Sequence, residues 1–229
     1  MIRDFSTGDL VLLLLAARWT IALSVIAFVG GSAVGLLVAL ARTSSARIPR
    51  YLATFYIELF QDTPLLMQLF VVFFGANVLG FQISAWTAVS IGLTLYGSAF
   101  LGEIWRGCIQ AVPAGQWEAA KALGLRTWQA SLLVVLPQAL RLAVPPTIGF
   151  LVQLIKNTSL ASIVGFTELT RTGQLVNNAT YEPLMVFLVV SLIYFALCWP
   201  LSLYAGHLER RFAAGTTRKV EKPLVMSAA

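Results

Sequence analysis

The residues with the clearest capacity for binding chemistry are charged and polar groups inside apolar segments. Lys156, Asn157 and Thr158 end one such segment, and Glu58 lies inside another. A charged group in hydrocarbon costs at least a few kcal/mol, so it faces protein, water or a bound ion. Broken helix ends at membrane depth are frequent ion and substrate sites. The pattern therefore predicts a substrate pathway that includes these four residues.

Structural roles compete with this interpretation. Lys156 could instead pair inside the protein with a carboxylate, for which the sequence offers Glu58, Asp62 or Glu168. Glu58 could tie its helix to a neighbour by a hydrogen bond. Glu103 and Arg106 are three residues apart on one predicted helical face, which favours an ion pair with a structural role.

Residue types needed for covalent or metal chemistry are not grouped in the sequence. His207 is the only histidine, and Cys108 and Cys198 are isolated. This spacing assembles neither a metal cluster nor a Cys-His nucleophile. No G-x-x-x-x-G-K-[S/T] segment occurs, so the chain lacks that phosphate-binding loop. We therefore expect no catalytic residue, no metal and no cofactor of its own, with Cys198 packed in the core and Cys108 facing a reducing cytoplasm.

A second candidate site lies at residues 113–137, between apolar segments. Helix propensity is high over residues 116–123, Gly124 can supply a left-handed stop, and Thr127 can cap a second helix that runs toward Pro137. The expected structure is a helix-turn-helix outside the bilayer.

This hairpin has the composition of a docking surface. Small methyl faces at Ala119, Ala120 and Ala122 would allow a partner to approach the backbone closely, and Glu118 offers one directed charge. An ordinary surface hairpin is the alternative.

Composition places these residues in a membrane protein. The chain has 229 residues, of which 58% are hydrophobic and 11% charged, and its mean hydropathy is +0.81. A soluble domain has a charged fraction of roughly a quarter. The length allows about five spans of roughly 20 residues and leaves no room for a separate soluble domain. We therefore expect one transmembrane domain over residues 1–229, with a core at 19–211 and a cytoplasmic tail at 212–229.

The apolar runs predict an all-α fold with about five transmembrane helices. The first run is too long for a bilayer core of about 30 Å, so we expect it to split near Arg18 into a short interfacial helix at 8–17 and a first span. Residues 157–182 are mixed, and part of them is expected to re-enter the protein interior. A cleaved signal peptide is the alternative for the N-terminus. The expected spans are 19–41, 51–79 (with a break or a protein-facing stripe in its first half), 84–104, 138–155 and 184–204.

Basic residues orient the spans. Arg3, Arg18 and Arg171 lie on one side, Lys156 lies within the membrane region, and twelve others lie on the opposite side. The positive-inside rule puts the N-terminus outside, the C-terminus in the cytoplasm and the helical hairpin between spans three and four in the cytoplasm. The net charge of +6 is explained by these anchors without nucleic acid. The twelve are Arg42, Arg47, Arg50, Arg106, Lys121, Arg126, Arg141, Arg210, Arg211, Arg218, Lys219 and Lys222.

The spacing of Glu118-Ala119-Ala120, Gly124, Leu136 and Pro137 resembles the cytoplasmic coupling loop of permease subunits in bacterial ATP-binding cassette importers. The resemblance extends over about residues 19–211 and points to the polar amino acid branch. One departure is Gln61-Asp62, where relatives carry a basic pair before Thr-Pro. The motifs on which the resemblance to this branch rests are Tyr56 to Phe60, Thr63 to Leu66, Glu103 to Gly107, Val112-Pro113, Gly115-Gln116 and Lys156 to Leu160.

The resemblance implies a multi-pass protein of the bacterial inner membrane with several partners. These are two copies of a cytoplasmic ATPase that uses the ATP, a second identical or homologous permease chain, an extracytoplasmic amino acid binding protein and the lipid bilayer. It implies that Glu118, Ala119, Ala120 and Gly124 fit a groove on the ATPase and that Pro137 ends the second helix at the membrane. The segments 154–157 and 20–24 resemble glutamate or aspartate permeases, and a central Lys156 suits an acidic side chain.

Other classes of function remain open from the residues alone. An ATP-independent secondary transporter or channel would use the intramembrane lysine and glutamate, although no inverted repeat is visible in the five unequal spans. An intramembrane hydrolase lacks paired carboxylates or a His-Asp pair on adjacent helices. The hairpin at 113–137 discriminates between these classes, because neither a channel nor an enzyme requires it.

Overall fold

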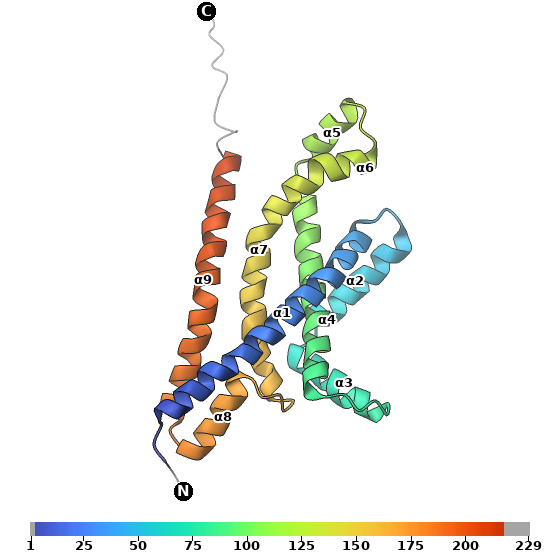
Figure 1. The fold of residues 1–229 in the computed structure, drawn as a ribbon. Coiled ribbons are helices and arrows are strands. Elements are labelled where there is room, and N and C mark those ends of the chain that lie inside the picture. The colour runs from blue at the N-terminus through green and yellow to red at the C-terminus, as the bar shows by residue number, and fades with distance from the viewer. Residues whose placement is uncertain (1–2, 218–229) are drawn as a thin grey trace, which may run out of the picture.

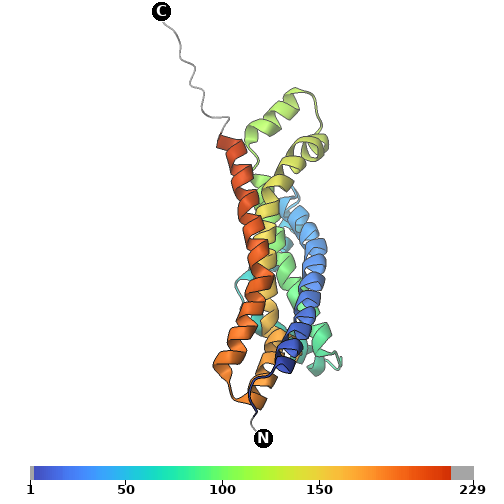
Figure 2. The same ribbon diagram turned by 60° about the vertical axis from the view of Figure 1, so that its left-hand side comes forward.

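The computed structural model describes residues 3–217, and the described residues form helices without strands (Figures 1 and 2). The predicted cytoplasmic tail at 212–229 lies largely outside the described residues, and the basic residues Arg218, Lys219 and Lys222 lie wholly outside them. Four helical stretches are long and apolar enough to cross a membrane, and there are up to five if the bent helix pair is counted as one span.

The elements are α1 (Thr7–Thr43), α2 (Arg47–Gln61), α3 (Leu65–Val78), α4 (Ala85–Gln110), α5 (Ala114–Ala122), α6 (Thr127–Ala130), a π-helical turn (Ser131–Val135), α7 (Leu136–Asn157), a 3-10 turn (Thr158–Ser162), α8 (Leu169–Thr180) and α9 (Pro183–Thr217).

The predicted split of the first helix near Arg18 is wrong. α1 is one continuous helix of 37 residues that runs obliquely across the molecule (Figure 1). The helix has no proline, and Arg18 is exposed with its guanidinium 5.5 Å from the centre of the Trp19 ring. An exposed cation does not force a helix to break. At 1.5 Å per residue α1 is about 55 Å long, which exceeds a bilayer core of about 30 Å, and its oblique course allows more of it to fit within that thickness.

The expected span at 51–79 is broken, as its polar residues suggested. α2 and α3 meet at 102° across Asp62–Pro64, and Pro64 is the N-cap of α3. Proline disfavours helical backbone at the preceding residue, which explains the position of the break. The Gln68 amide group donates to the Phe60 and Thr63 carbonyl oxygens at 2.9 and 3.0 Å. These bonds satisfy carbonyl groups left unpaired at the end of α2.

Close approach of α1 to α4 forms the centre of the bundle. A Cβ atom added at Gly31 would lie 3.2 Å from the backbone of Gly97 and Ser98, and one added at Gly35 would lie 3.0 Å from the Ser98 oxygen. The expectation that small residues of the first span allow helix contact is therefore confirmed at these two positions. The main apolar core lies around this contact and includes Leu23, Leu93, Leu101, Phe150 and Leu154.

The second helix of the hairpin does not end at Pro137, as the sequence predicted, but continues into α7. Thr127 to Ser162 form one helical stretch of 36 residues, and Pro137 lies within it, at the second position of α7. Proline lacks the N–H that would bond to the preceding turn, and the π-helical turn Ser131–Val135 lies immediately before it. Thr127 is also not the cap: Arg126 occupies the N-cap position of α6, with its backbone N–H bonded to Gln129 Oε1 at 2.9 Å.

Beyond Ser162, the mixed segment 157–182 contains no helix long enough to span a membrane. The 3-10 turn after α7 and the residues that follow it pack inward, with Ala161 and Val164 in the main core. α8 follows with 12 residues, too few for a bilayer core of about 30 Å. The expectation that part of this segment returns to the interior is therefore confirmed. α9 is longer than the expected span 184–204.

The two ends of the bundle carry different groups. Figure 1 places the α1–α2 connection, the α5–α6 hairpin and the C-terminal end of α9 at one end, and the N-terminus, α3 and α8 at the other. Of the larger predicted set of basic residues, Arg42, Arg47 and Arg50 flank the α1–α2 connection, Lys121 and Arg126 lie in the hairpin, and Arg210 and Arg211 lie near the C-terminal end of α9. Charge counting and the fold therefore agree on which connections share a side, while the assignment of that side to the cytoplasm stays a prediction.

Candidate coupling hairpin and substrate pathway

The turn of the coupling hairpin is a Schellman motif. Gly124 has φ +78°, its N–H donates to the Lys121 oxygen at 2.9 Å, and the Leu125 N–H donates to the Ala120 oxygen at 3.1 Å. This pair of bonds closes α5, and the left-handed conformation it requires is unstrained in glycine. The predicted left-handed stop at Gly124 is confirmed.

The outer surface of the hairpin differs in one residue from the predicted docking face. Glu118 and Ala119 are exposed, and Leu123 is 81% exposed. Ala120, by contrast, is only 2% exposed. Its methyl group therefore packs inside the hairpin and cannot receive a partner directly, so the expectation for Ala120 is wrong in this respect. Leu123 is an apolar tip that the sequence interpretation missed, although its position before Gly124 could have indicated it.

A compact apolar base fixes the hairpin to the bundle. Val112, Val135 and Ala139 are buried together, and Ile109 and Trp117 pack against them. The cluster joins the end of α4, α5, the π-helical turn and α7. We infer that the hairpin moves with these helices, because its base is packed like a core.

Polar contacts reinforce this base. The Gln138 amide group donates to Gln116 Oε1 at 3.1 Å and to the Val134 oxygen at 2.8 Å. Leu136 and Pro137 lie in the same region, at the first turn of α7, and both are exposed. They therefore belong to the base of the hairpin and not to the tip that carries Glu118.

The predicted substrate-pathway residues do not form one cluster through direct contacts. Lys156 is in the last turn of α7, and Glu58 is on α2; both are exposed. Among residues 3–217 the ion pairs are Arg3–Asp9 and Arg106–Glu103, so the alternative of an internal partner for Lys156 is wrong. Glu58 likewise makes no side-chain hydrogen bond within the described chain, and the expected tie to a neighbour is absent there.

Asn157 and Thr158 have local structural partners. The Thr158 hydroxyl is buried and donates to the Ile155 oxygen at 2.7 Å, which supports the change from α7 to the 3-10 turn. Asn157 Oδ1 accepts from the Gln153 amide at 3.3 Å. The structure therefore places Lys156 and Asn157 at an accessible helix end, with Thr158 behind them.

A cavity of about 490 Å³ lies between the end of α2, α4 and α7. Glu103 and Arg106 line it and form the expected ion pair, and Gln61 and Pro146 face it from the other two helices. Arg106 also donates to Gln110 Oε1. Most of its lining is apolar, and the Glu103–Arg106 pair is its charged part. Sequence reasoning missed this cavity, because its walls come from segments distant in the sequence.

Glu168 is a second residue whose role sequence reasoning missed, because its buried side chain connects three helices. Its side chain is fully buried and caps α8, accepting from the backbone N–H groups of Thr170 and Arg171 at 2.9 Å. Tyr194 of α9 donates to it at 2.9 Å, and Thr20 of α1 lies at 3.4 Å. Burial raises the pKa of Glu168 above its usual range. Glu168 thus joins α1, α8 and α9.

The two cysteines lie apart, on α9 and α4. Cys198 is buried with Val152 and Ile155, which confirms the core-packing prediction, and Cys108 is half-buried at the end of α4. No group of three His, Cys, Asp or Glu side chains that could hold a metal occurs in the described part of the chain.

Comparison with solved structures defines the class of the fold. An amino acid ABC transporter chain, solved "with histidines", superposes with a TM-score of 0.86 at 33% identity, over 92% of this chain and 100% of the other. A chain of the MetNI methionine ABC transporter gives a TM-score of 0.75 at 20% identity, which supports the fold alone. The fold is that of a transporter membrane subunit.

Sequence comparison defines the family. The family model "Binding-protein-dependent transport system inner membrane component" matches residues 31–214. A probable amino-acid ABC transporter permease, YckA of Bacillus subtilis (strain 168), is 35% identical over 85% of this chain and 86% of its own. A glutamine transport permease, GlnP of Escherichia coli (strain K12), is 33% identical over 87% and 92%. The chain therefore belongs to the inner membrane components of binding-protein-dependent transport systems, which are permease subunits of ATP-binding cassette importers.

The expected resemblance to the polar amino acid branch is confirmed by these relatives, and the chain is a multi-pass membrane protein.

Proposed function

We propose that this chain forms the translocation pathway of an ATP-driven amino acid importer and works by alternating access. The observation that carries the proposal is the exposed hairpin of α5 and α6, which stands at one end of the bundle on a packed base (Figure 2). The amino acid relatives support the substrate class. ATP is used by a separate subunit, in keeping with the lack of a phosphate-binding loop in this sequence.

The proposed assembly contains two copies of a cytoplasmic ATPase, a second permease chain that is identical or homologous, and an extracytoplasmic amino acid binding protein. In it the ATPase holds the hairpin tip. Exposed Glu118 pairs with a basic group of the ATPase, Ala119 allows close approach, and Leu123 enters an apolar depression. Gly124 shapes the turn that presents them, and Leu136 and Pro137 form the base.

Coupling is a shift of populations between two states of the permease. Closure of the ATPase subunits on ATP moves the hairpin, and the packed base passes this movement to α4 and α7. The outward-facing state becomes favoured, and hydrolysis restores the inward-facing state. To move a two-state equilibrium from 1:99 to 99:1, ATP must favour one state by about 5.5 kcal/mol.

The proposed substrate is an acidic amino acid, glutamate or aspartate. Lys156 supports this choice, because it is a cation without a carboxylate partner among the described residues, at the accessible end of α7. An ammonium group suits the second carboxylate of such a substrate. Asn157 can add an amide contact and Thr158 holds the helix end, while Glu58 lies on a separate helix, α2.

Reconstitution tests the function. The importer, with its ATPase subunits and binding protein, is placed in proteoliposomes and screened with glutamate, aspartate, glutamine, arginine, histidine and cystine. We expect ATP hydrolysis and uptake to rise together with glutamate or aspartate. Uptake without ATP would overturn the importer proposal and favour a secondary transporter or channel. Stimulation by another amino acid would overturn only the acidic substrate.

The role of Lys156 is tested by Lys156→Met and Lys156→Arg. If the ammonium contacts the substrate, Lys156→Met reduces the uptake rate at low substrate concentration by at least tenfold, while Lys156→Arg retains part of it. ATP hydrolysis in the absence of substrate serves as the control for assembly. Equal uptake by Lys156→Met and the unaltered chain would remove this residue from the pathway.

A further inference from the structure

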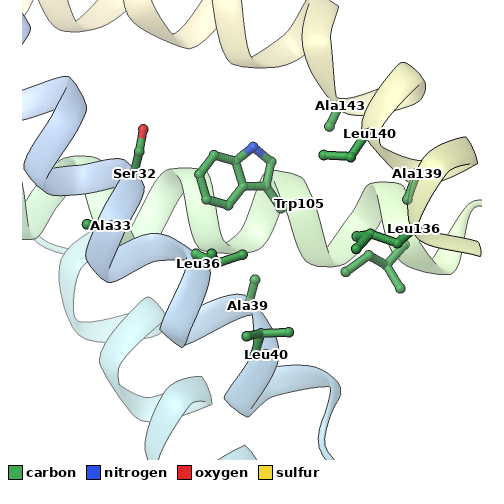
Figure 3. Close-up of a pocket in the computed structure, with 11 residues that line it drawn as sticks. Ser32, Ala33, Leu36, Ala39, Leu40, Trp105, Leu136, Ala139, Leu140 and Ala143 are labelled. Carbon is green, nitrogen blue, oxygen red and sulfur yellow. The ribbon is translucent and has the colours of Figure 1, made fainter. Parts of the chain in front are cut away.

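A groove between α1, α4 and α7 has an apolar part followed by a basic part, an order that is complementary to the acyl chain and phosphate of a phospholipid. Its deeper part is a cavity of about 430 Å³, within the range of small-molecule sites. Figure 3 shows the Trp105 indole rising from α4 between Ser32 and Leu36 of α1 and Leu140 and Ala143 of α7. The walls thus come from three helices that belong to the membrane-spanning bundle.

This deeper part is almost entirely apolar. Of its lining residues only Ser32 and Trp105 carry a polar side-chain atom. The Trp105 indole N–H already donates to Thr147 Oγ1 at 2.9 Å. A polar or charged ligand would lose its hydration here with almost nothing to replace it, whereas a hydrocarbon chain loses nothing. The chemistry of the cavity therefore suits an acyl chain.

A second cavity, of about 510 Å³, continues the first toward the end of the bundle. The two share Leu40, Ile109 and Leu136. The second is lined by Arg42 and Arg50, and no Asp or Glu lines it. Neither arginine has an ion-pair partner among residues 3–217.

The sequence along α1 sets the spacing of these groups. Arg42 is in the last turn of the helix, and Ser32 is ten residues earlier, about 15 Å deeper into the bundle. A charged end followed by about 15 Å of apolar wall matches a lipid that lies with its headgroup at the membrane surface. Basic pockets between transmembrane helices at the membrane surface bind anionic headgroups.

We propose that this groove is a binding site for one anionic phospholipid, with its acyl chain against Trp105 and its phosphate between Arg42 and Arg50. A second copy of the chain fits the groove less well. Burying both arginines in a protein interface would leave two cations without a carboxylate, which is costly. Val135 and Leu136 of its lining also belong to the base of the hairpin, but the test of the site needs neither the substrate nor the import mechanism.

The test counts bound lipid on the chain, purified in detergent with the subunits that stay bound to it and stripped of endogenous lipid. Phosphatidylglycerol and phosphatidylcholine with identical acyl chains are titrated separately, and bound lipid is measured by native mass spectrometry. Each basic residue near an anionic surface contributes on the order of a fivefold factor. We therefore expect about 25-fold tighter retention of phosphatidylglycerol.

Two variants separate the charge from the groove. Arg42→Gln with Arg50→Gln should abolish the preference for phosphatidylglycerol, whereas Arg210→Gln with Arg211→Gln, which removes the same charge at the exposed end of α9, should preserve it. Ser32→Phe, which fills the apolar cavity, should weaken retention of both lipids.

Three results would overturn the proposal. They are equal retention of the two lipids by the unaltered chain, a preference that survives loss of Arg42 and Arg50, and retention unchanged by Ser32→Phe. A disulfide between two copies carrying Ser32→Cys would be a fourth such result, because it would assign the groove to a second chain. If the double arginine variant does not fold, Ser32→Phe and the lipid comparison still decide the question.

Discussion

Gly124 is the residue whose backbone most directly shapes the proposed coupling surface. At φ +78° an alanine costs about 1–2 kcal/mol, although no heavy atom lies within 4 Å of the added methyl group. Gly124→Ala should therefore loosen the hairpin turn without a clash. We expect at least a tenfold loss of substrate-stimulated ATP hydrolysis in the reconstituted importer, with normal insertion.

Gly115 supplies a matched control in the same hairpin. It lies in α5, its φ is not in the left-handed region, and an added methyl group meets nothing within 4 Å. Gly115→Ala should therefore leave ATP hydrolysis unchanged and slightly stabilise α5. Equal effects of the two substitutions would show that added bulk, and not the left-handed backbone, decides the coupling.

Glu168 should give the protein a pH dependence. Because burial raises its pKa in the folded state, the protonated form is favoured by folding. Its contribution to stability is complete below the ordinary glutamate pKa of about 4.3 and is lost as the pH rises through the folded-state pKa. In thermal unfolding from pH 4 to 8, Glu168→Gln should show a smaller fall in Tm than the unaltered chain. An identical slope in both would exclude Glu168 as its source.

Residue types could be predicted from the sequence more reliably than residue partners. Gly124 was identified because a left-handed stop between two helical segments calls for glycine. The burial of Ala120 and the isolation of Lys156 were not predictable, since the first depends on how α5 packs against the segment after its turn and the second on how distant helices pack. Glu168 was considered only as a partner for Lys156, yet its position before Leu169 is that of a helix cap.

At the scale of elements, the contact between α1 and α4 should tolerate no added volume. A methyl group on Gly35 would lie 3.0 Å from the Ser98 backbone oxygen, which cannot move independently of α4. Gly35→Ala should destabilise the chain by about 1–3 kcal/mol through overpacking. Gly149→Ala on α7, where nothing lies within 4 Å, is the control and should be neutral. Thermal unfolding in detergent compares them, and equal midpoints would contradict the packing argument.

The elements themselves were largely predictable because apolar runs of membrane length are a strong signal. All five expected spans correspond to helices, and the break before Pro64 followed from its polar neighbours. The continuity of α1 past Arg18 and of α7 past Pro137 did not follow. In both cases the expectation rested on a single residue. Arg18 is exposed and so does not interrupt α1, whereas a π-helical turn precedes Pro137 and allows the helical stretch to continue through it.

At the scale of the whole molecule, the arrangement predicts a definite orientation. The α1–α2 connection shares an end with the coupling hairpin, and the α3–α4 connection lies at the other end (Figure 1). In a chain carrying Cys108→Ser and Cys198→Ala, Ser45→Cys should react with a membrane-impermeant thiol reagent only from the cytoplasmic side. Gln82→Cys should react only from outside. The reverse pattern would invert the orientation.

The helical stretch from Thr127 to Ser162 has a mechanical consequence. Its 36 residues form a rod of about 54 Å that joins the hairpin to the accessible end near Lys156. Pro145 and Pro146 lie at its midpoint, where two backbone hydrogen bonds are missing and bending is easiest. The stretch should therefore bend most easily at its centre, between the half that carries the π-helical turn and the half that ends near Lys156. The hairpin end and the Lys156 end can therefore swing in different directions while the core around Phe150 stays packed.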